Sequence, residues 1–256
     1  LASSPKWLAI RARRGRVSLD KLKRARQAAK LISWVPFVRM VGVGNTVALG
    51  VPEAESDVDF LVIVKPGRLF LTRLLVTLLL QVRGWRRHGN LIAHRICLSF
   101  YLSTAAYNLA PLAYEDDPYL AIWCVSLLPL AGETAYQDFC AANTWVTRSL
   151  LQPFREPHLV GAISDASVRE LPRRQTKIVE WALGGWLGYI CEQLAKVYQE
   201  HRIRVNRASR LGDGSTAVVV SDTELKFHES DRRPEWALEF RERFAHVLEV
   251  AYAKGR

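Results

Sequence analysis

The stretch that decides the fold is VGVGNTVALGVPEAESDVDFLVIV, residues 41–64. A first apolar run ends at Gly44 and Asn45, a short connection follows, and a second apolar run opens with Asp57 and Asp59. Side chains alternate along a strand with period two, so both aspartates should project from the same face where this strand begins. Two carboxylates held that close repel each other unless a cation lies between them. Carboxylate oxygens are ligands that Mg²⁺ and Mn²⁺ prefer, so the pair predicts a divalent metal site.

A glycine stands in the turn that leads away from the first apolar run. Glycine allows backbone N–H groups to come close to a phosphate group. A glycine turn, paired carboxylates and a divalent metal are together the parts that hold a nucleoside triphosphate and transfer its phosphoryl group.

At these residues the chain resembles the nucleotidyltransferase superfamily, which has the polymerase-beta-like fold. The pattern of that family is an apolar strand, Gly-Gly or Gly-Ser, a connection, and Asp-x-Asp within a second apolar strand. The resemblance covers about residues 35–104. Gly44 matches the glycine, and Asn45 stands where serine is usual, with an amide that can still donate a hydrogen bond. Ser56, directly before the acid pair, is typical of the small members.

The resemblance implies that Asp57 and Asp59 are catalytic and bind Mg²⁺ or Mn²⁺. It implies that Gly44, Asn45 and Ser56 contact the nucleoside triphosphate. In related enzymes the helical lobe often supplies a lysine to the triphosphate. Lys226 is the candidate here, and an ordinary surface lysine is the alternative.

The family usually takes a third carboxylate from a later strand, which in this chain is expected at residues 96–102. That strand carries Cys97 and Ser99 but no acid. The next acids along the chain are Glu115, Asp116 and Asp117. Either this loop reaches back to the metal, or its acids cap the helix that follows, or the metal site is incomplete.

The pattern predicts an α+β fold in which a small mixed-sheet nucleotidyltransferase lobe precedes a mostly helical lobe. Residues 1–34 are expected to form a basic helical arm, residues 35–104 the nucleotidyltransferase core, and residues 105–256 a helical C-terminal domain. Within that last region a single long helix is expected over residues 177–199.

The net charge of +11 is unevenly distributed. Residues 6–30 carry ten lysines and arginines against Asp20 alone. A charge stripe of this density attracts polyanions, so RNA or DNA is the partner that residues 6–30 favour. A solvated helix face is the alternative.

Four widely spaced cysteines without a CxxC pair predict free thiols in a reducing cytoplasm. The most apolar run, residues 69–82, is too short to span a bilayer and contains an arginine, so no membrane partner is expected.

The sequence therefore predicts a cytoplasmic, metal-dependent nucleotidyltransferase that moves a nucleoside monophosphate from a nucleoside triphosphate to an acceptor hydroxyl. An RNA end, a protein side chain and a small molecule all remain open as the acceptor. The alternative is a non-catalytic module that binds nucleotide or nucleic acid and has lost the third metal carboxylate.

Overall fold

The computed structural model describes residues 5–115, 117–147, 168, 171–205, 216–228 and 231–254. The helices and strands of these residues follow one another as α1 (Pro5–Ile32), β1 (Val38–Val43), α2 (Asn45–Ala48), β2 (Val58–Val64), α3 (Leu69–Val82), β3 (Ile96–Ser103), η1 (Ala110–Leu112), α4 (Pro118–Ser126), β4 (Leu128–Ala131), α5 (Glu133–Ala142), α7 (Arg173–Ala182), α8 (Trp186–Val205), β5 (Val218–Val220), β6 (Glu224–Phe227) and α9 (Arg233–Lys254).

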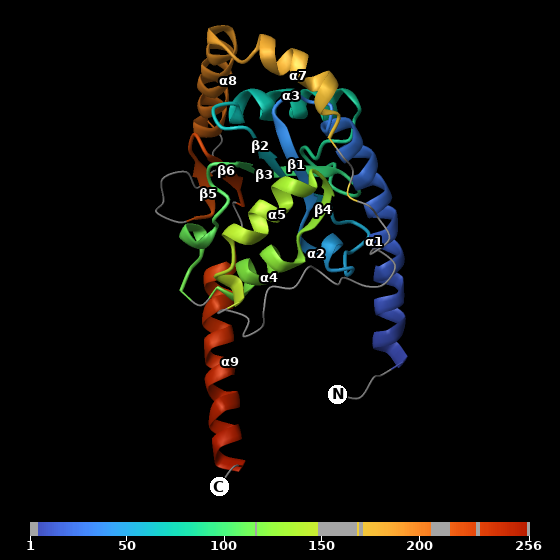
Figure 1. Ribbon diagram of the computed structural model, residues 1–256. Coiled ribbons are helices and arrows are strands. Elements are labelled where there is room, and N and C mark those ends of the chain that lie inside the picture. Colours follow the sequence, from blue (N-terminus) through green and yellow to red (C-terminus); the bar gives the residue numbers. More distant parts are fainter. Residues whose placement is uncertain are drawn as a thin grey trace.

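A six-stranded sheet runs through the centre of the molecule in the order β4-β1-β2-β3-β6-β5 (Figure 1). Strands β2 and β3 are parallel, and every other neighbouring pair is antiparallel. The expected α+β fold with a mixed sheet is confirmed.

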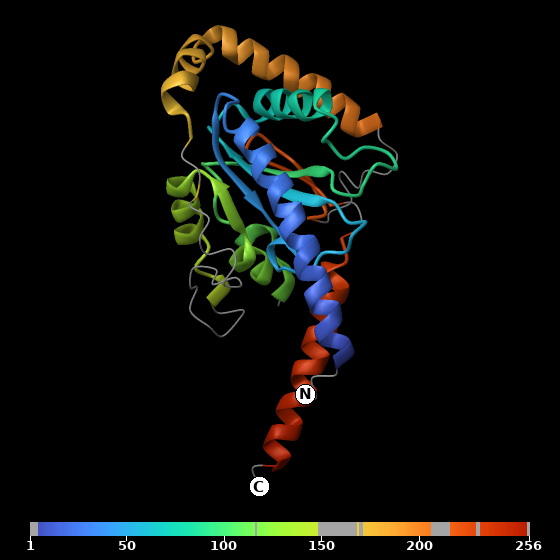
Figure 2. The same ribbon diagram turned by 90° about the vertical axis from the view of Figure 1, so that its right-hand side faces the viewer.

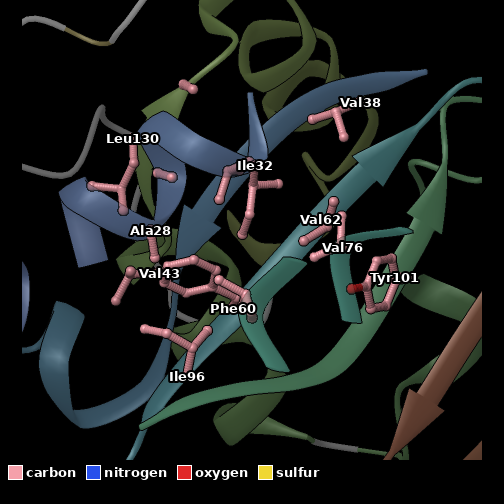
Figure 3. Close-up of a cluster of buried hydrophobic side chains, with 14 of the residues drawn as sticks. Ala28, Ile32, Val38, Val43, Phe60, Val62, Val76, Ile96, Tyr101 and Leu130 are labelled. Atoms are coloured by element: carbon pink, nitrogen blue, oxygen red, sulfur yellow. The ribbon is translucent and has the colours of Figure 1, made fainter. Parts of the chain in front are cut away.

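Helices cover both faces of the sheet, and β2 is buried between them. Phe60 and Val62 point to the face covered by α1 and α3, where they pack with Ile32 and Val76 (Figure 3). The alternate residues of β2, including Leu61, belong to a second apolar cluster on the side of α4 and α5. Figure 2 shows α1 crossing one face of the sheet and α8 lying over α3. This alternation places Asp59 on the α4 side.

Three strands of the region expected to be helical belong to the same sheet. β4 pairs with β1, β6 pairs with β3, and β5 pairs with β6. The expected boundary between residues 104 and 105 therefore falls within one continuous sheet. β4 has only four residues, one of them a proline, and such a segment gives almost no strand signal in the sequence.

The single helix expected over residues 177–199 is in fact two helices, α7 and α8, because the chain turns between them at residues 183–185. Gly188 lies directly against the turn, where a Cβ atom would come within 1.7 Å of the Leu183 carbonyl oxygen. In the described part of the chain, no helix combines the length and apolar character needed to cross a membrane.

Candidate functional site

Asp57 and Asp59 lie together at the start of β2, as the sequence predicted. Cys97 joins them, because β2 and β3 run parallel and Cys97 is the register partner of Asp59. One ligand atom from each of these three residues lies within 4.8 Å of the other two. The carboxylate pair is thus close enough to share one cation, and Cys97 stands on the strand where the resemblance leads one to expect a third carboxylate.

Arg87 neutralises part of this cluster. Its Nη1 donates to Asp57 Oδ2 at 2.7 Å and lies 3.8 Å from the Cys97 sulfur. The side chain of Asp57 is only 15% exposed, so this ion pair is partly shielded from solvent. A metal ion that binds Asp57 must therefore compete with a guanidinium.

The surroundings of Asp59 disfavour its ionised form. Burial raises its pKa, and so does the neighbouring negative charge of Asp57, while hydrogen bonds from Asn45 and Cys97 act in the opposite direction. Burial also raises the pKa of the Cys97 thiol to about 12, with Asp59 and Asp57 adding to the shift. Cys97 is therefore a protonated thiol at neutral pH and a poor ligand for a hard cation.

The side chain of Asn45 is engaged in two hydrogen bonds, and one of them orients Asp59. Its Nδ2 donates to Asp59 Oδ2 at 2.7 Å, and its Oδ1 accepts from the Tyr119 hydroxyl at 2.8 Å. Its backbone is left-handed, with φ at 55°, a conformation that asparagine adopts more readily than serine. This backbone requirement gives a physical reason for asparagine at the position.

Gly44 is needed for close packing. A Cβ atom at this position would lie 2.7 Å from Nε1 of Trp123 on α4, and the Gly44 N–H already donates to the Asp59 carbonyl oxygen at 3.0 Å. The glycine thus lets α4 approach the start of β2. If the Gly44 N–H is to donate to a phosphate group, as the sequence predicts, it must first give up its hydrogen bond to the Asp59 carbonyl oxygen.

Ser56 shapes the connection before the acid pair and is not among the residues that line the adjacent cleft. Its hydroxyl donates to the Glu53 carbonyl oxygen at 2.9 Å, and its own carbonyl oxygen accepts from the buried Lys21 ammonium group of α1. Lys21 also donates to the Ala54 carbonyl oxygen at 3.0 Å. One lysine of the basic residues 6–30 therefore holds in place the loop that precedes Asp57.

A cleft of about 1110 Å³ opens beside the acid pair. It forms where β3 continues past β6, because β6 pairs only with Phe100 and the two residues after it. Residues of α3 and α8 line one end of the cleft, and residues of α4 and α9 line the other. Asp59, Asn45 and Tyr119 belong to the α4–α9 end by their contacts.

Lys226 lines this cleft but is not an ordinary surface lysine, since it is only 4% exposed. Its ammonium group bonds to the Thr216 carbonyl oxygen and lies 3.7 Å from Asp231. Burial lowers its pKa to about 8, and the nearby Arg233 adds to that shift. At neutral pH it is therefore mostly protonated and is held by Thr216 and Asp231.

Asp117 has the structural role that was the alternative to metal binding. Its carboxylate accepts from the Leu120 N–H at 2.9 Å, which caps α4, and pairs with Arg233 at 3.2 Å. Glu115 is exposed and pairs with Arg241 at 3.6 Å. Asp116 lies outside the described residues.

Three contributors to the site were not anticipated from the sequence: Arg87, Tyr119 and Arg73. Arg87 belongs to a basic cluster visible in the sequence, but its pairing with Asp57 depends on the path of the loop before β3. Tyr119 and Arg73 reach the cleft from helices that looked like ordinary core elements.

A scan against protein-family models and searches of curated proteins and of solved structures found no match for this chain. The interpretation of the site therefore rests on its own residues and geometry.

Proposed function

We propose that this chain is a metal-dependent nucleotidyltransferase that moves a nucleoside monophosphate from a nucleoside triphosphate to an acceptor hydroxyl. The observation that carries the proposal is the pair of carboxylates, Asp57 and Asp59, gathered within 4.8 Å beside a cleft lined by arginines. Carboxylates next to cationic side chains suit a ligand that is both metal-bound and phosphorylated.

The two aspartates fit a divalent cation such as Mg²⁺ or Mn²⁺. They supply two hard oxygen ligands, and the remaining positions would be filled by water and by phosphate oxygens of the substrate. Asp59 favours such an ion further, since its pKa is raised by burial and by the adjacent charge of Asp57, which a cation would offset. When bound, the ion would neutralise phosphate charge and acidify the attacking hydroxyl.

The protein's own residues have distinct tasks in this proposal. Asn45 and Tyr119 hold Asp59 in one orientation by the hydrogen-bond chain from Tyr119 through Asn45. Lys226 lines the cleft and would donate a hydrogen bond to the triphosphate in exchange for its pairing with Asp231. The acceptor oxygen bonds to the α-phosphorus, the bond from that phosphorus to the bridging oxygen breaks, and pyrophosphate leaves with the electron pair. The hydroxyl proton departs to solvent in the open cleft.

The test is pyrophosphate release from each of the nucleoside triphosphates, with Mg²⁺ or Mn²⁺ and a short RNA as acceptor. The wild-type protein should release pyrophosphate and extend the RNA, and Asp59→Asn and Asp57→Asn should do neither while remaining folded by circular dichroism. Equal turnover in the wild-type protein and either variant would refute the assignment of the site.

A second candidate function is a binding module that retains the fold without catalysis. Two observations favour it: Cys97, a protonated thiol, stands where a third carboxylate is expected, and Arg87 already occupies Asp57. This candidate predicts nucleotide or nucleic-acid binding with no pyrophosphate release under any metal condition.

A further inference from the structure

The cations that line the cleft fall into two groups with different electrostatic surroundings. At the Asp59 side they are neutralised: Arg87 pairs with Asp57, Arg233 with Asp117 and Asp231, Lys226 with Asp231, and Arg232 with Glu235. At the α3–α8 side lie Arg73, Arg86 and Arg202, for which the described residues provide no carboxylate within salt-bridge distance. Among the described residues, positive charge is therefore left unbalanced at that end.

Arg73 is the most constrained of the three. Its Nη1 donates to the Gln199 side-chain oxygen at 2.5 Å, and its guanidinium lies 4.7 Å from the centre of the Phe227 ring. Its Nε is buried and has no hydrogen-bond partner among the described residues. The Tyr101 hydroxyl, which interacts electrostatically with Arg73, is buried and without a partner as well.

The described residues thus give the Arg73 guanidinium a hydrogen bond to Gln199 and a contact with the Phe227 ring, but no carboxylate partner. Burial lowers the pKa of Arg73, Tyr101 acts in the opposite direction, and the charge of Arg86 again lowers it. Buried charges in folded proteins are normally paired, since an uncompensated ion loses its hydration with nothing in return. Gln199, anchored by its amide to the Phe70 carbonyl oxygen at 2.8 Å, and Phe227 hold the guanidinium in one position. A planar guanidinium held in one position in this way is suited to donate hydrogen bonds to the oxygens of a phosphate group.

We propose that Arg73, Arg86 and Arg202 bind a backbone phosphate of a nucleic-acid strand, so that the acceptor of the reaction is an oligonucleotide end. Naming this strand as the acceptor rests on the proposed function, whereas the phosphate site itself does not. The cleft extends from these arginines to Asp59 and exceeds the roughly 300–1,000 Å³ of ordinary small-molecule pockets. It thus has room for a nucleotide near the carboxylates and a strand terminus near the arginines.

The experiment measures binding of a fluorescent three-nucleotide RNA to the full chain without divalent metal, with ATP and inorganic phosphate as competing ligands. The variants are Arg202→Gln, Arg73→Gln and the charge-preserving Arg73→Lys. Arg204→Gln is the matched control, because Arg204 lies on the same helix, is also exposed, and does not line the cleft. Circular dichroism and thermal melting verify that each variant is folded.

The proposal predicts that Arg202→Gln and Arg73→Gln each weaken RNA binding about tenfold, the loss expected for one charge-assisted hydrogen bond. Each should also reduce the salt dependence of binding by about one released counterion. Arg204→Gln should bind like the wild-type protein, Arg73→Lys should retain part of the affinity, and inorganic phosphate should compete with the RNA.

Two results would overturn it. If Arg202→Gln and Arg73→Gln bind RNA as well as Arg204→Gln does, the proposed phosphate site is refuted. Weakened ATP binding with unchanged RNA binding would assign the arginines to the triphosphate. Because no metal or turnover is involved, RNA binding can succeed where the pyrophosphate assay fails, so the two proposals fail separately.

Discussion

Replacing Asp59 by asparagine should stabilise the metal-free protein at neutral pH. Asp59 is a partly buried carboxylate whose pKa is raised by desolvation and by Asp57, so its ionised form is unfavourable in the folded state. Asparagine has nearly the same shape and can still accept the hydrogen bond from Asn45 through its side-chain oxygen. The substitution therefore removes the repulsion and keeps the contact.

The size of the effect follows from the geometry. At the 4.8 Å that bounds the separation of the ligand atoms, two unit charges repel by about 3.5 kcal/mol at an effective dielectric constant near 20 and by about 0.9 kcal/mol in bulk water. Arg87, paired with Asp57 at 2.7 Å, offsets part of this repulsion. A net stabilisation of about 1 kcal/mol should raise the melting temperature of a chain of this size by about 2–4 °C.

The assay is thermal melting of the wild-type protein, Asp59→Asn and Asp57→Asn, each with and without Mn²⁺. Asp57→Asn is the informative contrast, because it relieves the same repulsion but also breaks the ion pair with Arg87. It should therefore gain less stability than Asp59→Asn. Mn²⁺ should raise the melting temperature of the wild-type protein and leave both variants unchanged.

The pH dependence has a definite sign. The folded-state pKa of Asp59 lies above its unfolded value, so its favourable contribution is complete below the unfolded pKa and is lost as pH rises through the folded pKa. The stability advantage of Asp59→Asn should accordingly grow as pH rises through that folded pKa. A variant that melts below the wild-type protein at neutral pH without metal, or that keeps the Mn²⁺ shift, would refute this reasoning.

Three further perturbations test other parts of the site. Arg87→Gln should tighten Mn²⁺ binding measured by calorimetry, since it removes the cation that competes for Asp57, and unchanged affinity would mean that the ion pair does not limit metal binding. Cys97→Asp should supply a third carboxylate and increase Mg²⁺ affinity at least tenfold, and its failure to do so would place the metal away from β3. Asp117→Ala should lower the melting temperature, because it removes the α4 cap and leaves Arg233 without this ion-pair partner. The metal requirement of transfer should stay the same, and an altered metal requirement would indicate that Asp117 is a metal ligand.

The basic arm gives a separate prediction. α1 is one continuous helix, and part of its charge serves the fold: Lys21 anchors the loop before Asp57, and Arg24 lies 4.4 Å from the centre of the Trp85 ring. Deleting residues 1–16 removes five other basic residues. RNA affinity should fall and its salt dependence should flatten in a binding titration, and an unchanged salt slope would argue against nucleic-acid binding by this arm.

The centre of the fold was predictable because its signals are local. β2 (Val58–Val64) begins directly after Asp57, and period-two alternation is enough to put Asp57 and Asp59 on one face. The apolar residues of α1, among them Leu22, Ala25 and Ile32, recur at helical spacing and are buried as expected. In both cases the neighbours along the chain determine the outcome.

The rest of the site depends on contacts between distant segments. Tyr119 reaches Asp59 through Asn45, 74 positions away along the chain, and Arg73 is fixed by Gln199, 126 positions away. Gly44 looked like a phosphate-binding glycine, but the approach of Trp123 explains it better. The residue pattern within one segment cannot predict contacts with a distant segment. A glycine needed for close packing also cannot be told from a phosphate-binding glycine in the sequence.

The most direct test of the account is a crystal structure with Mn²⁺ and a non-hydrolysable nucleoside triphosphate, analysed by anomalous scattering at the manganese edge. The account predicts a manganese peak bridging Asp57, Asp59 and the triphosphate oxygens, with Arg87 displaced from Asp57. A nucleotide bound in the cleft with no manganese at the two aspartates and the Arg87 pair intact would contradict it.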